Sequence, residues 1–201
     1  MEEILPGIHH WTAFRDTIGA RVHSYYVEPA GALIDPMEPE EGVEALGRLG
    51  ERPRVVLLSN RHHYRHADRF AGAFGCTVLA SEPGMHEFEG TDREVTAFAF
   101  GDEVAPGITA HEVGSICPDE TALHIAHGGG AVAFADGLVR ARDGSLTFVP
   151  DGLMDDPEGT KRGLRDAFRR LLDRDFDALL MAHGEPWVGG GKAALERFAG
   201  A

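Results

Sequence analysis

Lysine and cysteine are scarce in this sequence, and long hydrophobic runs are missing. Only Lys161 and Lys192 are lysines, so arginine supplies the other 17 of the 19 basic side chains, against 33 acidic ones. A chain with a net charge of −14 is a poor general binder of nucleic acid, because phosphate contacts need an excess of basic residues. The sequence therefore predicts no nucleic-acid partner and only weak attraction to anionic membranes.

No apolar stretch approaches the ~18 residues that a membrane-spanning helix needs. The first residues, Met1-Glu2-Glu3-Ile4, lack the basic start and the apolar segment of a secretory signal. Neither Cys76 nor Cys117 lies in a CxxC pair, which excludes a zinc knuckle. We therefore expect a cytoplasmic protein with no membrane partner and with a free thiol at Cys76.

The chain is long enough to bury a sizeable core, and 43% of its residues are hydrophobic. It contains no internal repeat and no Gly/Ser-rich or Pro-rich linker, which predicts a single domain over residues 1–201.

Apolar patterning predicts strands interleaved with fewer helices, which is typical of a layered α/β (α+β) domain. The expected strands are 22–28, 32–35, 55–58, 76–80, 95–100, 108–113, 121–126, 131–135 and 176–181. The expected helices are 40–49, 67–74, 155–174 and 192–198, with glycine following the first two and an acidic cap and proline opening the third.

Histidine is the most informative residue type, and three of the 11 histidines fall in His62-His63-Tyr64-Arg65-His66. This segment follows the apolar strand 55–58, and α/β proteins place functional groups at the carboxyl ends of such strands. The alternative is a solvated cationic loop, since Arg61 and Arg69 flank the same histidines. Asp119-Glu120 could act as an acid pair, although adjacent carboxylates are usually solvated.

The order of motifs resembles the metallo-β-lactamase superfamily over nearly the whole chain. That family has a strand, then T-H-x-H-x-D-H, a later histidine after a glycine, a G-D-x-L segment and a histidine in a strand-ending H-G. The corresponding segments here are 59–65, Gly114-Ser115-Ile116, Ala135-Asp136-Gly137-Leu138 and Ala182-His183-Gly184. The resemblance implies a four-layer αββα sandwich, and it places the N-terminal hairpin with His9-His10-Trp11 near the pocket or at the surface.

Three positions match the family's metal ligands, namely His62, Asp136 and His183. The departures are Asn60 and Arg65 in place of histidines, Tyr64 in place of the aspartate, and Ser115 or Ile116 in place of the third histidine. Two zinc ions need about four ligands each, so this set cannot hold two. An arginine at a ligand position also repels a cation because it stays protonated.

Binding of a single metal ion is an alternative, since His62, Asp136 and His183 would form a two-histidine, one-carboxylate ligand set. His63 or His66 could replace His62, although a shift of one residue rarely preserves the direction of the imidazole. We expect no cofactor, with one zinc or other divalent metal ion as the alternative. Without metal, a buried Asp136 needs a cation, and we expect Arg65, or otherwise Arg61, to bond it.

Three functions follow from this pattern. The first is a metal-free protein that binds a small anionic ligand in a pocket formed by Asn60, His62, Tyr64, Arg65, Asp136 and His183. The second is a one-metal hydrolase of an ester, thioester, lactone or phosphoester. The third is a non-catalytic structural or regulatory protein. The sequence predicts neither the substrate nor the oligomeric state, and a homo-oligomer is one alternative.

Overall fold

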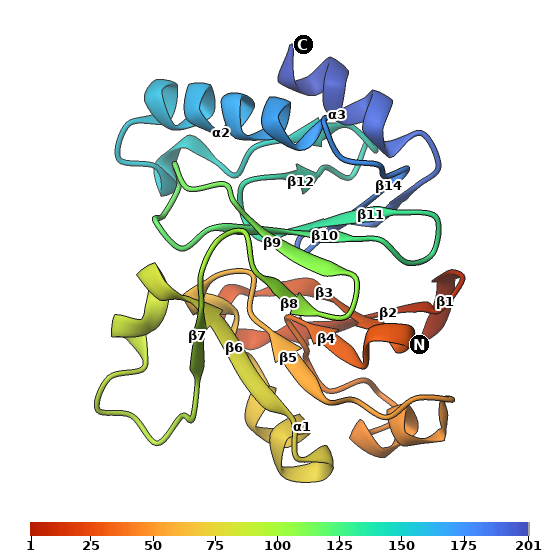
Figure 1. The fold of residues 1–201 in the computed structure, drawn as a ribbon. Helices are drawn as coiled ribbons and strands as arrows, with labels where there is room; N and C mark the ends of the chain where they lie inside the picture. The colour runs from red at the N-terminus through yellow and green to blue at the C-terminus, as the bar shows by residue number, and fades with distance from the viewer. Residues whose placement is uncertain (201) are drawn as a thin grey trace.

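Two mixed β-sheets form the centre of the molecule in the computed structural model, which describes residues 1–200 (Figure 1). The first sheet has seven strands in chain order, antiparallel up to β4 and parallel from β4 onward. Its strands are β1 (Glu2–Leu5), β2 (Ile8–Arg15), β3 (Ala20–Val27), β4 (Ala32–Ile34), β5 (Val55–Leu57), β6 (Thr77–Ser81) and β7 (Thr96–Phe98).

The second sheet has six strands in the order β15-β14-β11-β10-β9-β8, and only β11 and β14 are parallel. In chain order these are β8 (Glu103–Ala105), β9 (Ile108–Glu112), β10 (Thr121–Ile125), β11 (Ala131–Phe134), β14 (Ala178–Met181) and β15 (Trp187–Val188). A separate ribbon pairs β12 (Val139–Arg140) with β13 (Leu146–Thr147).

Helices cover the outer faces of both sheets. Helix α1 (Ala67–Phe74) packs on the first sheet, and α2 (Pro157–Leu171) and α3 (Gly191–Ala199) pack on the second (Figure 1). The central core lies between the sheets and joins residues such as Tyr25 and Leu180. This arrangement confirms the predicted αββα sandwich.

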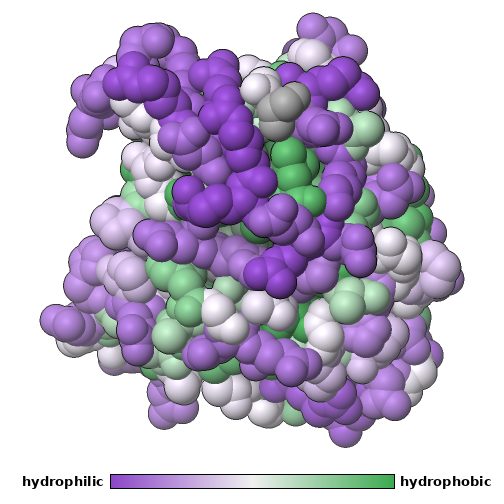
Figure 2. Space-filling model, turned by 45° about the horizontal axis from the view of Figure 1, so that its top comes forward, coloured by the Kyte–Doolittle hydropathy of each residue, from purple (hydrophilic) through white to green (hydrophobic). Residues whose placement is uncertain are grey.

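Local sequence explains where the helices begin and end. Asp156 caps α2 by accepting a hydrogen bond from the Gly159 amide at 3.0 Å, and its buried Leu164 and Phe168 face the second sheet. Gly75 ends α1 in the left-handed conformation. The opposite face of α2 carries the largely hydrophilic surface seen in Figure 2. No helix in residues 1–200 is long and apolar enough to cross a membrane.

The expected helix over 40–49 is wrong in type and length. The structure has a 3₁₀-helix over Val43–Arg48, because Gly42 (φ 81°) breaks the backbone before it. The N-terminal hairpin that the resemblance implies is present as β1 and β2. The short strands β8, β12, β13 and β15 were not expected, since their patterns are short or mix polar with apolar residues.

The topology brings four strand ends to one edge of the sandwich. Strands β4 and β5 are parallel neighbours in the first sheet, and β11 and β14 are parallel neighbours in the second. Their carboxyl ends are followed by Asp35, Asn60, Asp136 and His183, respectively. Polar residues that lie far apart in sequence therefore meet between the two sheets.

Candidate functional site

The Asp136 carboxylate is the centre of the polar network at this edge. Its Oδ1 lies 3.0 Å from His183 Nε2 and 3.5 Å from His63 Nε2, and its Oδ2 accepts a hydrogen bond from Asn60 Nδ2 at 2.8 Å. Burial alone would raise the pKa of Asp136, but the imidazoles of His63 and His183 lower it far more, so its pKa lies well below the usual range. Asp136 is therefore a carboxylate that already has partners.

His63 is clamped between two carboxylates. Its Nδ1 lies 2.9 Å from Asp35 Oδ2, while its Nε2 faces Asp136, and only 2% of its side chain is exposed. Burial lowers the pKa of His63, but Asp35 and Asp136 raise it more, to about 9. The imidazole is consequently a cation at neutral pH.

Asp35 is the carboxylate on the Nδ1 side of His63. It is 2% exposed, and its carboxylate accepts hydrogen bonds from the Ser59 amide at 2.8 Å and from the Ser59 hydroxyl. Burial raises the pKa of Asp35, but the nearby His63 and Arg65 cations and the hydrogen bonds lower it below its usual value. Asp35 was absent from the predicted site, although an aspartate as the last residue of the predicted strand 32–35 was the available signal.

Glu120 lies behind Asp136 and is fully buried. Its Oε1 accepts hydrogen bonds from the amides of Asp136 and Gly137 at 2.8 and 2.6 Å, and Asn60 Nδ2 lies 3.3 Å from its Oε2. Burial and the Asp136 charge raise its pKa to about 8. The expectation that Asp119 and Glu120 are solvated is thus wrong, since both have no exposed surface.

Arg65 is directed inward, but it does not bond Asp136 as expected. Its Nη1 donates to the carbonyl oxygens of His23 and Asp35 at 2.7 and 2.6 Å, and its charge acts on Asp136 only through space. The backbone of Arg65 is left-handed (φ 47°), a conformation uncommon for residues other than glycine. Arg61, the second choice, forms its ion pair with Asp119.

Two further predicted residues lie outside the Asp136 network. His62 is exposed, and the imidazole that reaches Asp136 belongs to His63. Tyr64 is buried against Phe88, and its ring supports the Arg93 guanidinium at 4.4 Å. The structure therefore brings together Asn60, Asp136 and His183, but neither His62 nor Tyr64.

The one-residue shift from His62 to His63 has a local cause. Asn60 accepts a hydrogen bond from the His62 amide at 3.0 Å and thereby caps a 3₁₀-helix over Arg61–His63. In this tight turn His63 points into the cluster and His62 points outward. An asparagine two residues before His62 was a signal for such a cap.

The donor set does not fit two metal ions. Asn60 offers no strong metal ligand and is bonded to Asp136, Tyr64 is packed in the core, and Arg65 brings a positive charge. The donor atoms that are present do suit a single metal ion. His63, Asp136 and His183 each offer one ligand atom, and these three atoms lie within 4.8 Å of one another. Asp35 contacts the far nitrogen of His63, which is the position from which a carboxylate commonly orients a metal-bound histidine.

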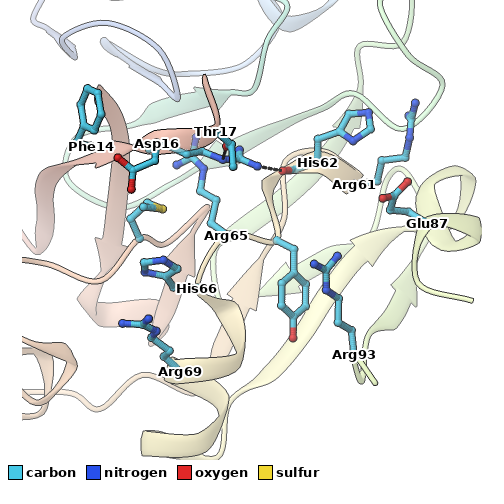
Figure 3. A pocket seen from close by; sticks show the side chains of 13 residues that line it. Phe14, Asp16, Thr17, Arg61, His62, Arg65, His66, Arg69, Glu87 and Arg93 are labelled. Atoms are coloured by element: carbon cyan, nitrogen blue, oxygen red, sulfur yellow. Dashed lines mark hydrogen bonds between the residues drawn. The ribbon is translucent and has the colours of Figure 1, made fainter. Parts of the chain in front are cut away.

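A separate cavity of about 610 Å³ is lined by Arg61, His62, Tyr64 and Arg65 but by none of the residues that bond Asp136, and we call it the arginine cavity (Figure 3). Phe14 lines it from the end of β2, and Asp16 and Thr17 line it from the turn that follows. Arg61, Arg65 and Arg69 line it from the segment around α1. The charged residues that line the arginine cavity are Arg15, Arg61, Arg65, Arg69, Arg93, Asp16 and Glu87. Arg61 and Arg69 form ion pairs with Asp119 and Glu38, which do not line the cavity. Arg15, Arg65 and Arg93 make no ion pair among residues 1–200, and they leave the cavity positive in a chain whose net charge is −14.

Comparison with known proteins identifies the fold. A metallo-β-lactamase from Hirschia baltica superposes with a TM-score of 0.71 at 13% identity, over 98% of this chain and 94% of that one. A metallo-β-lactamase family protein from Thermus thermophilus superposes with a TM-score of 0.69 at 16% identity, over 98% of this chain and 80% of that one. No protein-family model matches the sequence, and none of the curated proteins matches it.

A third solved structure, of a protein in a di-iron-bound form, has a TM-score of 0.68 and 20% identity, and the match covers 91% of this chain and 96% of that one. These relationships show that the chain has the metallo-β-lactamase fold. At such identities the likeness concerns the fold alone.

Proposed function

We propose that this protein binds a small anionic molecule in the arginine cavity and needs no metal ion to do so. The observation that carries the proposal is the charge of that cavity. Five of the chain's 17 arginines converge on one hollow, although acidic residues outnumber basic ones by 33 to 19. Guanidinium groups bind carboxylates and phosphates with paired hydrogen bonds, so the cavity suits a ligand with one or more such groups.

The volume of the cavity sets the size of the ligand. About 610 Å³ falls within the range of small-molecule sites, and it would hold a molecule of several anionic groups. Phe14 is 55% exposed at the rim and offers an apolar surface next to the charges. We therefore expect a ligand with a charged end and a less polar end.

The Asp136 network supports a metal-free state. A metal ion would neutralise this carboxylate in the usual form of the fold, and here two imidazoles and the Asn60 amide contact it directly. Asp136 is therefore stabilised by protein groups, as a buried carboxylate requires.

Calorimetric titration with pyrophosphate tests the proposal. Arg93 is exposed at the rim and makes no ion pair among the described residues, so Arg93→Ala should weaken binding about tenfold, the effect of losing one charged hydrogen bond. Arg162→Ala removes the same charge from exposed α2 and should leave the affinity unchanged. Equal affinities of the two variants, or no binding by the unmodified protein, would reject the arginine cavity as the site.

A one-metal hydrolase is the second candidate, favoured by the convergence of His63, Asp136 and His183. A divalent ion bound by them would act as a Lewis acid on a carbonyl or phosphoryl oxygen. Elemental analysis of protein purified without chelator separates the two functions. We expect that His183→Ala does not change the amount of metal bound per chain. One ion per chain that is lost in His183→Ala would favour the hydrolase.

A further inference from the structure

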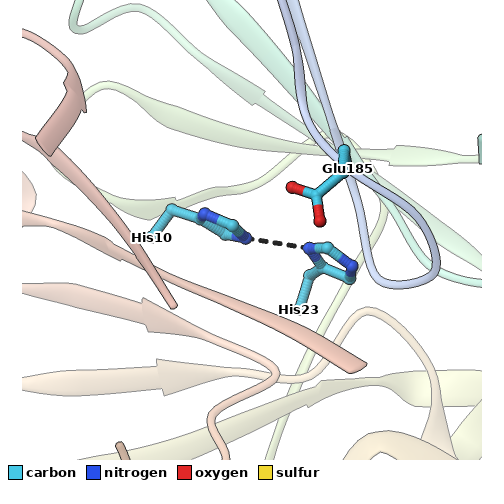
Figure 4. A group of neighbouring side chains, drawn as sticks. All are labelled: His10, His23 and Glu185. Atoms are coloured by element: carbon cyan, nitrogen blue, oxygen red, sulfur yellow. Dashed lines mark hydrogen bonds between the residues drawn. The ribbon is translucent and has the colours of Figure 1, made fainter. Parts of the chain in front are cut away.

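A second pair of histidines, His10 and His23, lies on the first sheet, and its side chains make no hydrogen bond or ion pair with the Asp136 network. His10 on β2 and His23 on β3 are placed on one face of the sheet, since His10 pairs with Tyr25 and Thr12 pairs with His23 in the antiparallel register. His10 Nε2 lies 2.8 Å from His23 Nδ1, so the two rings share one hydrogen bond (Figure 4).

This pair is buried without enough partners. Each residue is only 4% exposed, and His10 Nδ1 has no hydrogen-bond partner among residues 1–200. The closest carboxylate oxygen, Glu2 Oε1, is 3.6 Å away, which is too long for a hydrogen bond. Burying an imidazole nitrogen without a hydrogen-bond partner costs stability, so packing of the core does not explain why two histidines stand here.

The Glu185 carboxylate completes the group from the second sheet. It follows β14 in the loop that also carries His183, and Figure 4 shows its carboxylate directed at the two rings. One ligand atom each from His10, His23 and Glu185 lies within 4.8 Å of the others. Two imidazoles and a carboxylate from three separate segments therefore converge on one point.

We propose that His10, His23 and Glu185 bind one divalent transition-metal ion of the zinc class. Imidazole and carboxylate are ligands that Zn²⁺ accepts, and three protein ligands leave a fourth position for water or another ligand. At Zn–N distances of about 2.0–2.1 Å, tetrahedral geometry separates two ligand nitrogens by about 3.3 Å. The present 2.8 Å contact has to open by only about half an ångström as the ion replaces the shared proton.

The surroundings of the group favour a cation. A cavity of about 470 Å³ beside it is lined by His10 and by four acidic residues, namely Glu2, Glu40, Glu41 and Glu185. Its permanent cations are the Arg21 guanidinium and the Met1 ammonium group, and the ammonium group is paired with Glu41 at 2.8 Å. Glu2 Oε1 lies 3.6 Å from His10 Nδ1, and a shift of about half an ångström would let it accept a hydrogen bond from that nitrogen, as carboxylates do behind metal-bound histidines. Burial lowers the pKa of His10 and His23, which agrees with neutral rings.

The test is calorimetric titration with Zn²⁺ alone after treatment with chelator. It is done in an Asp136→Asn background, which disables the His63 cluster, and we expect one saturable zinc per chain. Glu185 is exposed, so Glu185→Gln should fold normally and weaken zinc binding by at least about a hundredfold, whereas Glu2→Gln should weaken it about tenfold. His86→Gln, which removes an exposed histidine elsewhere, is the matched control.

Loss of all zinc binding in the Asp136→Asn background would overturn the proposal, because the ion would then belong to the other cluster. An unchanged affinity in Glu185→Gln would overturn it as well. His23→Gln should also abolish binding, and circular dichroism checks that this variant is folded. If it is not folded, the Glu185→Gln and Glu2→Gln results decide. None of these outcomes depends on whether the arginine cavity binds an anion.

Discussion

The molecule contains two clusters with the same composition and opposite electrostatics. Each has two histidines and one carboxylate with ligand atoms within 4.8 Å: His63, Asp136 and His183 in the first, and His10, His23 and Glu185 in the second. In the first cluster the carboxylate is central and both imidazoles contact it. In the second the imidazoles contact each other, and the carboxylate lies at the exposed side.

This difference in arrangement sets the charge of the rings. The carboxylates on both sides of His63 raise its pKa to about 9, whereas burial, with His10 and His183 nearby, lowers the pKa of His23 to about 3. At neutral pH one ring is a cation and the other is neutral. Only a neutral imidazole has a free electron pair for a metal ion, so ligand composition alone does not identify a metal site.

The largest expected effect is the loss of the Asp35 carboxylate. Asp35→Ala leaves the His63 cation with one carboxylate fewer and the Ser59 amide without its acceptor, all in a buried position. We expect the free energy of unfolding to fall by about 3–5 kcal/mol, as for other broken buried pairs. Urea denaturation measures this.

Asp92→Ala is the matched control for that measurement. It also removes an aspartate, but an exposed one, and should change stability by less than about 0.5 kcal/mol. If both variants were equally stable, His63 could not be a cation clamped by two carboxylates, and the contrast between the clusters would disappear.

The next effect is a loss of stability at alkaline pH. The folded-state pKa of His63 is about 9, above the ordinary value of 6.5, so its contribution is complete below pH 6.5 and is lost as the pH rises through 9. The shift corresponds to about 3 kcal/mol. Glu120, whose pKa is raised to about 8, acts in the same direction. Unfolding followed from pH 6.5 to 9.5 should show this decline, and His63→Gln should flatten it.

The second cluster predicts the opposite slope in mild acid. His23 has a folded-state pKa of about 3, so the unfolded chain takes up a proton below pH 6.5 while the folded chain does not. Its contribution is complete above pH 6.5, and about 2 kcal/mol is lost by pH 5. The His23→Gln variant should lose less stability than the unmodified protein between pH 7 and 5. An identical decline in both would show that His23 is protonated in the folded state.

Much of the fold was predictable, because strand and helix patterns do not depend on fine geometry. The predicted helix over 67–74 was confirmed residue for residue as α1, and the order of motifs indicated the αββα sandwich. The segment 40–49 has the apolar spacing of an α-helix, but Gly42 and Gly47 weaken it, and it forms a 3₁₀-helix instead. Spacing alone does not separate these two helix types.

The site was less predictable, because it depends on the direction of single side chains. Matching motifs put Asp136 and His183 at strand ends, and both lie in the cluster. Two local details then differ from the prediction: the Asn60 cap goes with the inward direction of His63, and the Arg65 guanidinium bonds the carbonyl oxygens of His23 and Asp35. The contact between His10 and His23 depends on strand register, which is set when the sheet forms.

The smallest expected effect completes the comparison, since it concerns the carboxylate of the second cluster. Glu185 is exposed and forms no hydrogen bond or ion pair with residues 1–200, unlike Asp136. Without metal, Glu185→Gln should therefore change the free energy of unfolding by less than about 0.5 kcal/mol. With zinc at 100 times its dissociation constant, the unmodified protein should gain about 2.7 kcal/mol, and the variant should gain much less. A variant that is destabilised without zinc would instead make Glu185 a structural partner of the histidine pair, and the two clusters would then be alike.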